Sequence, residues 1–186
     1  MKSVTIKDVM GWKPCPEYTK ERVTELFAGR DSLTATDILN LNIPSKDMLW
    51  AVLREELIPT NILHEFACRC AEEALKSIKN PDKRSIAAIE AKRKWIKGEI
   101  TKVELDAAGK AARAAARAAA EGVAAAEGAA AEGVAAEGAA RAAGVAAAAE
   151  GAAAAEGAAA AAALAAAGAA AGAEQIEILK ELLGVA

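Results

Sequence analysis

The chain has 186 residues, of which 54% are hydrophobic, 26% charged and only 3% aromatic, and its net charge is −3. This length suits one domain, or one domain with an extension, and the slightly acidic balance does not favour nucleic acid as a partner. Three cysteines without a recognisable secretory signal indicate a reduced cytoplasmic protein with free thiols.

The first hundred residues predict a series of short helices separated by clear stop signals, which are Gly29, Pro59 and Gly98. The expected helices run from Pro16 to about Phe27, from Thr34 to Leu39, from Lys46 to Glu56, from Thr60 to about Ile78 and from Asp82 to Lys97. Ser45 and Thr60 are the expected caps of the third and fourth. No segment alternates apolar and polar residues with a period of two, so no sheet is expected.

A segment rich in Ala, Gly and Glu follows, and a capping box formed by Thr101 and Glu104 predicts the start of its first helix. Gly-Val pairs recur every eleven residues, which is about three helical turns. Because small residues on one stripe let two helices approach closely, this stripe predicts close helix packing. Its members are Gly122, Val123, Gly133, Val134, Gly144 and Val145.

The sequence therefore predicts an all-α fold in three parts. Residues 1–100 form a bundle of short helices with the main hydrophobic core, and residues 101–173 form Ala/Gly-rich helices packed closely as antiparallel hairpins. Residues 174–186 form an amphipathic helix that docks on the core. The alternative for the middle part is one straight helix from Lys102 to Gly172, which would be roughly 105 Å long. The many glycines weaken such a rod.

Few residues in this chain carry catalytic or metal chemistry. His64 and Cys68 share one face of a predicted helix, but Cys70 points elsewhere, and Cys15 could add only one ligand toward the four of a structural zinc site. Nothing in the sequence places an orienting group and a cleft beside His64 and Cys68, as a nucleophilic site would need. We expect these residues to pack between helices, and we expect no metal, no cofactor and no enzymatic activity.

Two segments bear on possible partners. A locally basic stretch on the last of the short helices could form a face for an anionic partner, and its candidate residues are Lys83, Arg84, Lys92, Arg93, Lys94 and Lys97. The alternative is an ordinary solvated helix face. The uncharged segment from Gly157 to Ala173 is short for a membrane helix and lacks Leu, Ile and Phe, apart from Leu164, so no membrane partner is expected.

The run from Asp47 to Leu53 and the run from His64 to Leu75 resemble a family of bacterial and phage immunity proteins. The resemblance continues through Pro81 to Glu90, Trp95 to Thr101 and the Ala-rich repeat. It implies a toxin-neutralising role but no catalytic residues. In relatives, aromatic residues and Asp interrupt the Ala repeats, whereas in this chain Gly, Val and Glu interrupt them.

These observations favour a protein-binding module of the immunity or phage counter-defence kind, which masks the surface of a toxin or defence component. A structural protein that self-assembles through its Ala–Gly stripes into a homo-oligomer is the main alternative. An ice-binding helical protein is a weaker one, because such proteins present regularly spaced Thr and no Thr follows Thr101.

Overall fold

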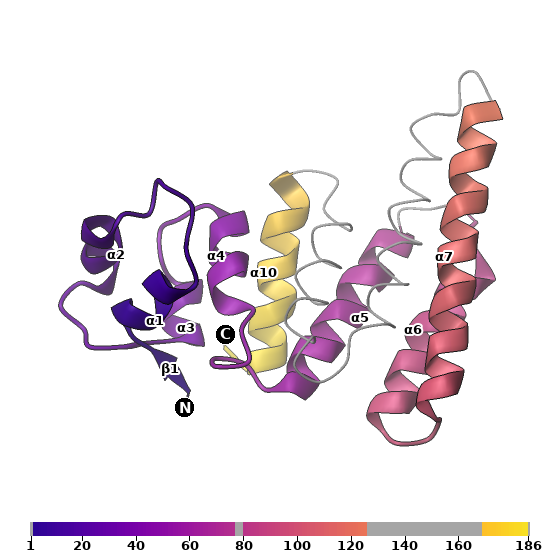
Figure 1. The fold of residues 1–186 in the computed structure, drawn as a ribbon, viewed down its shortest axis with the longest axis horizontal. Coiled ribbons are helices and arrows are strands. Elements are labelled where there is room, and N and C mark those ends of the chain that lie inside the picture. The colour runs from indigo at the N-terminus through magenta and orange to yellow at the C-terminus, as the bar shows by residue number, and fades with distance from the viewer. Residues whose placement is uncertain (1, 77–79, 126–168, 186) are drawn as a thin grey trace.

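The computed structural model describes residues 2–76, 80–125 and 169–185, and helices dominate these ranges (Figure 1). The predicted all-α fold is therefore confirmed. The expectation of no sheet is wrong in detail, because β1 (Ser3–Val4) pairs antiparallel with β2 (Leu33–Thr34). Strands of two residues are too short to show a period of two in the sequence, but this pair buries Val4 and Leu33 in the core.

Four short helices form the N-terminal part of the molecule. They are α1 (Ile6–Gly11), α2 (Lys20–Phe27), α3 (Ala35–Leu39) and α4 (Ser45–Val52). Thr34 and Asp37 form a complete capping box before α3, and Thr5 and Asp8 form another before α1, which the sequence analysis missed. The same two-residue signal therefore starts both helices.

Two helices have different bounds from those expected. The helix expected from Pro16 begins instead at Lys20, because the Thr19 hydroxyl accepts the backbone N–H of Arg22. The helix expected to reach Glu56 ends at Val52. Its N-cap is Pro44, with no side-chain hydrogen bond, so Ser45 is not the cap that we expected.

The centre of the molecule is formed by α5 (Thr60–Lys76) and α10 (Ala169–Leu183). Figure 1 shows the C-terminal helix α10 lying between α4 and α5, which are far from it in sequence. Its Ile176, Ile178 and Leu179 are buried and join the main core with side chains of α2 to α5. The largest fully buried members of this core on α5 are Phe66 and Leu63.

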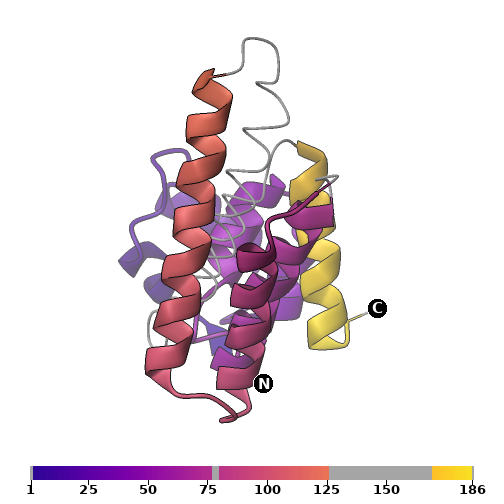
Figure 2. The same cartoon turned by 90° about the vertical axis from the view of Figure 1, so that its right-hand side faces the viewer.

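A helical hairpin, α6 (Lys83–Ile96) and α7 (Lys102–Ala125), packs on the far side of α5. The two helices run antiparallel and side by side (Figure 2). A second, smaller core lies between them, in which Ala88 of α6 meets Leu105 and Ala112 of α7. The Asp82 carboxylate caps α6, and the predicted capping box of Thr101 and Glu104 starts α7. This hairpin joins the last short helix to the first Ala-rich helix, whereas the predicted hairpins lie within residues 101–173. The choice between further hairpins and one long rod lies outside the described residues.

Candidate functional site

An apolar pocket of about 310 Å³ lies among the N-terminal helices. Its walls come from α1 to α4 and the loops that join them. The apolar wall residues are Val9, Pro14, Val23, Leu26, Phe27, Leu33, Ile38, Leu41, Ile43, Trp50 and Ala51. Pockets that bind small ligands or single side chains combine such walls with a few polar groups at defined places. This pocket therefore has the character of a binding site.

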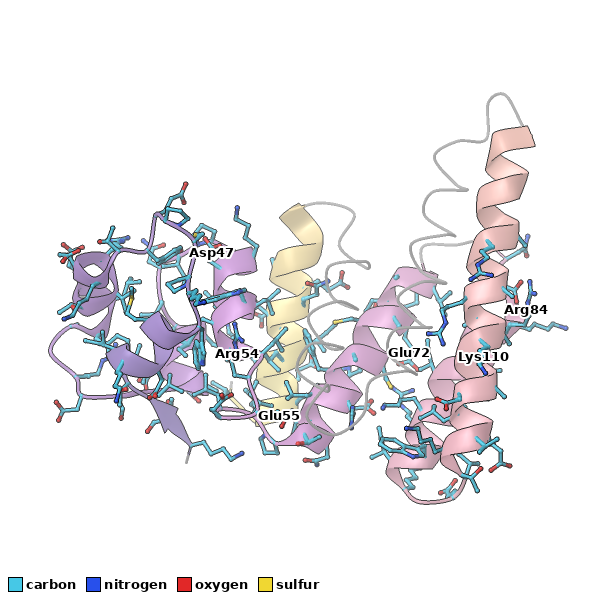
Figure 3. All side chains as sticks on the ribbon, in the orientation of Figure 1. Asp47, Arg54, Glu55, Glu72, Arg84 and Lys110 are labelled. Carbon is cyan, nitrogen blue, oxygen red and sulfur yellow. The ribbon has the colours of Figure 1, made fainter. Side chains whose placement is uncertain are left out.

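The polar groups of the pocket are Tyr18, Lys46 and Asp47, with Cys15 in the same lining. The Tyr18 hydroxyl donates a 2.9 Å hydrogen bond to Oδ2 of Asp47 and so ties the loop before α2 to the first turn of α4. Burial, and then the hydrogen bond to Asp47, raise the pKa of Tyr18 to about 12. The phenol is therefore protonated and donates throughout the neutral range. Figure 3 shows Asp47 on α4, on the side of the N-terminal helices.

A tryptophan stands at the rim of the pocket. Trp50 lines the pocket, yet 37% of its surface is exposed. Its ring meets Trp12 edge-on, with 6.2 Å between the ring centroids, and the Arg54 guanidinium lies 4.8 Å from the centroid of each ring. Such cation–π contacts hold an aromatic rim in place. A large exposed aromatic side chain beside an apolar pocket is typical of protein-binding surfaces.

The local sequence explains why this pocket is bordered by a stiff loop. The loop from Lys13 to Tyr18 contains Pro14 and Pro16, whose rings fix the backbone φ angle. Lys13 has a φ of +55°, which bends the chain directly after α1. Pro14 and Cys15 of this loop line the pocket, and the hydrogen bond from Tyr18 to Asp47 holds the end of the loop.

The structure separates the six basic residues that the sequence analysis grouped on one face. Lys92 is fully buried, with its ammonium group 4.2 Å from the centroid of the Trp95 ring. Arg93 turns toward α5, where its Nη2 donates to Oε1 of Glu65 at 2.6 Å and to Oε2 of Glu72 at 2.9 Å. Hydrogen bonds to Glu72 and Glu65 raise the pKa of the guanidinium. The expectation that Lys92 and Arg93 face a partner is therefore corrected.

The other four basic residues are exposed. Arg84 pairs with Asp82 of its own N-cap at 2.7 Å. Lys83, Lys94 and Lys97 lie within about 60° of one another around the helix, at about 100° per residue. We call Lys83, Lys94 and Lys97 the α6 lysine row. Whether this row binds a partner stays a prediction.

His64, Cys68 and Cys70 are buried on α5, where we expected them to pack between helices. The His64 ring meets the Trp95 ring edge-on, with 5.6 Å between centroids. Burial raises the pKa of both thiols to about 12, so neither is a thiolate at neutral pH. Across the described ranges, no three His, Cys, Asp or Glu side chains gather closely enough to hold a metal ion.

Most of the Gly-Val stripe falls outside the described residues. Gly122 and Val123 belong to α7, although nothing is described of their side chains, while Gly133, Val134, Gly144 and Val145 lie in the segment 126–168. The close helix packing that the stripe predicts is therefore untested. Within the described ranges, no helix has both the length and the apolar character needed to cross a membrane.

The pocket itself was missed by sequence analysis. Asp47 and Trp50 were noted only within the run from Asp47 to Leu53, and Tyr18 carried no motif at all. The pocket residues come from different elements and meet only through folding. The available signal was Trp50 in a helix whose apolar face is formed by Met48, Leu49 and Val52. A tryptophan away from that face predicts an exposed aromatic side chain.

Comparisons with protein-family models, with curated proteins and with solved structures give no match for this chain.

Proposed function

We propose that this chain is a non-enzymatic binding protein that recognises a partner protein through the pocket and the tryptophan rim of its N-terminal helices. The observation that carries the proposal is an apolar pocket of about 310 Å³ beside Trp50, which keeps 37% of its surface exposed. Tryptophan is enriched among the residues that dominate binding energy at protein interfaces. We call the surface formed by the pocket, Trp12 and Trp50 the pocket face.

The side chains that could support catalysis are buried, which favours a binding function over an enzymatic one. The Cys68 and Cys70 thiols are buried and protonated at neutral pH. The single His of the chain, His64, is buried against Trp95 and does not line the pocket that α1 to α4 form. A nucleophile and a base at a shared cleft would be needed for hydrolysis or group transfer.

The kind of partner follows from the resemblance to bacterial and phage immunity proteins. A protein of that kind neutralises a toxin, or a component of host defence, by covering the surface that the partner needs for its own activity. We therefore propose a cytoplasmic protein partner that is masked by the pocket face. The α6 lysine row is the rival recognition surface, because its three exposed lysines could attract an acidic partner.

Purification of the tagged full chain from its native host tests the proposal. The wild-type chain should retain one stoichiometric protein partner. Trp50→Ala should lower the affinity for that partner at least tenfold, as truncation of a dominant interface residue does. The matched variant Lys83→Ala/Lys94→Ala alters the rival surface and should retain the partner.

Three outcomes contradict the proposal. Retention of the partner by Trp50→Ala but not by the lysine variant would move recognition to α6. Recovery of no stoichiometric partner would contradict a binding function. Self-association of the wild-type chain in light scattering, abolished by Trp50→Ala, would instead support the self-assembling alternative. Circular dichroism of each variant checks that the helical fold is intact.

A further inference from the structure

We infer that the pocket among α1 to α4 binds a free small molecule, a neutral aromatic compound of about the size of indole whose one hydrogen-bond donor binds Asp47. The inference goes beyond the proposed function, because it concerns a free small molecule and not a protein. Three observations carry it, which are the volume of the pocket, the aromatic side chains in its walls and the hydrogen bond between Tyr18 and Asp47.

The volume of the pocket suits a two-ring molecule. An apolar cavity of about 150 Å³ is large enough to bind benzene. The pocket here has about 310 Å³, so it has room for a second ring. Since a Phe side chain ends in a single benzene ring, one such side chain would fill only about half of this space. The volume also falls within the range of about 300–1,000 Å³ that is typical of small-molecule sites.

The walls of the pocket are rich in aromatic rings for so poorly aromatic a chain. The chain contains three Trp, two Phe and one Tyr, and one residue of each kind lines the pocket, namely Trp50, Phe27 and Tyr18. Aromatic rings attract one another edge-on or in offset stacks, beyond what the burial of their surface contributes. The walls therefore favour a flat aromatic ligand over a flexible acyl chain.

The inner walls of the pocket exclude a charged ligand body. Val23, Leu33 and Ile38 are buried members of the main core that also line the pocket, and none of them has a hydrogen-bonding side chain. A charged group placed against them would lose its hydration without compensation, which is strongly unfavourable. An uncharged aromatic ring gains free energy from the same burial.

The polar point of the pocket accepts hydrogen bonds. The Tyr18 hydroxyl donates its only hydrogen to Oδ2 of Asp47 at 2.9 Å, and a carboxylate has further lone pairs but no donor. Together the two groups complement a donor such as an aromatic N–H, and the charge of Asp47 repels an anion. Lys46 also lies in the lining, but it is exposed, and an exposed ammonium group stays hydrated.

Titration of the full chain with indole tests this inference, with methyl NMR shifts as the readout. We expect saturable shifts of the Leu26, Leu41 and Ile43 methyl groups, with a dissociation constant on the order of 0.1 mM, as for a good small fragment. The Val103 methyl groups, which are exposed on α7, should not shift. They report any nonspecific effect of the ligand.

Two analogues of indole test its donor and its charge. In 1-methylindole a methyl group replaces the N–H hydrogen, and we expect about tenfold weaker binding, as for loss of one hydrogen bond to a charged group. Indole-3-acetate adds a negative charge and should bind at least tenfold more weakly than indole.

Matched variants locate the site and the acceptor. Ala51→Phe places a ring in the pocket and should lower the affinity for indole at least tenfold, whereas Ala87→Phe, on the exposed face of α6, should leave it unchanged. Asp47→Ala should bring the affinity for indole down to that for 1-methylindole and leave the latter unchanged. An equal loss for both ligands would show that Asp47 only supports the fold, and would overturn its role as the acceptor.

The wild-type titrations alone can overturn the inference, even if a variant fails to fold. Absence of saturable shifts at the pocket methyl groups would do so, as would 1-methylindole or indole-3-acetate binding as tightly as indole. Tighter binding of octanoate would assign the pocket to acyl chains, and equally tight binding of N-acetyl-L-leucinamide would assign it to a peptide side chain. Concentration-dependent shifts without ligand would assign it to a second copy of the chain.

This inference and the proposed function fail separately. Binding of indole at the pocket without a protein partner in the host would retain the inference and overturn the function. A partner lost in Trp50→Ala, together with no indole binding by the wild-type chain, would retain the function and overturn the inference.

Discussion

Cys68 and Cys70 lie inside the main core, whereas Cys15 is exposed beside the pocket. Only a thiolate reacts with thiol reagents, and burial raises the pKa of the two core thiols to about 12. We predict that one thiol per chain reacts with a disulfide reagent at pH 8, and that all three react in denaturant. Mass spectrometry of the labelled peptides identifies Cys15 as the reactive residue. Rapid native labelling of Cys68 would contradict the burial.

The same raised pKa values determine how stability depends on pH. The folded state keeps both core thiols protonated, whereas the unfolded chain releases their protons near the ordinary pKa of about 8.5. The free energy of unfolding is therefore unaffected by these two thiols below that pH, and it falls above it because ionisation favours the unfolded chain. Cys68→Ala should reduce the slope of this alkaline decline. That slope, measured by denaturant unfolding between pH 8 and pH 10, checks the sign.

Three consecutive basic residues on α6 have three different environments. Lys92 is buried against Trp95, Arg93 bonds Glu65 and Glu72 on α5, and Lys94 is exposed. Successive residues of a helix point about 100° apart, so a run of like charges in a sequence cannot form one face. The sequence therefore revealed the charges of α6 but not which of them are exposed.

At the scale of the elements, helix starts were the most predictable feature. The capping boxes at Thr34 and Thr101 involve residues three apart, and the hydrogen bonds that form them depend only on local backbone geometry. The start of α2 and the end of α4 were less predictable. Pro16 is compatible with a first helical turn, but the Thr19 cap decides where α2 begins.

Gly98 forms the turn between α6 and α7 with a φ of +73°, a conformation in which most side chains are strained. No neighbouring atom would meet a Cβ at this position, so only the backbone conformation opposes a substitution. We predict that Gly98→Ala lowers the free energy of unfolding by about 1 kcal/mol. Urea unfolding monitored by circular dichroism measures this change.

Gly11→Ala is the matched control for this element. Gly11 is the last residue of α1, also has no atom within 4 Å of a Cβ, and does not have a positive φ. We expect no loss of stability, and a small gain of up to about 1 kcal/mol, because Ala restricts the unfolded chain. Equal losses in Gly98→Ala and Gly11→Ala would contradict the conformational explanation.

At the scale of the whole molecule, the C-terminal helix α10 packs against helices from the first half of the chain, α3, α4 and α5. Leu179 of α10 is fully buried, and α10 lies between α4 and α5 (Figure 1). Gly172 approaches Ser45 so closely that a Cβ there would lie 3.1 Å from the serine Cβ. We predict that Leu179→Ala lowers the free energy of unfolding by about 2–5 kcal/mol, as cavity-forming substitutions do. Tryptophan fluorescence and circular dichroism should report one common transition at lower urea.

Val103→Ala is the control for this prediction, because 77% of the Val103 surface is exposed on α7. It should change stability by less than about 0.5 kcal/mol. A Leu179→Ala loss no larger than that of Val103→Ala would show that the main core does not depend on α10. Loss of helicity without any change in Trp12 and Trp50 fluorescence would contradict a single cooperative core.

The amino-acid sequence by itself determined the helical class, most of the helix starts and the amphipathic character of the C-terminal helix, because each depends on residues within a few positions of one another. Only the tertiary structure decided that α10 packs between α4 and α5, that Lys92 is buried and that Phe27 and Ile38 line a pocket. Those features arise where elements that are far apart in the sequence pack together. They depend on the shapes of the packed helices, which no local sequence pattern specifies.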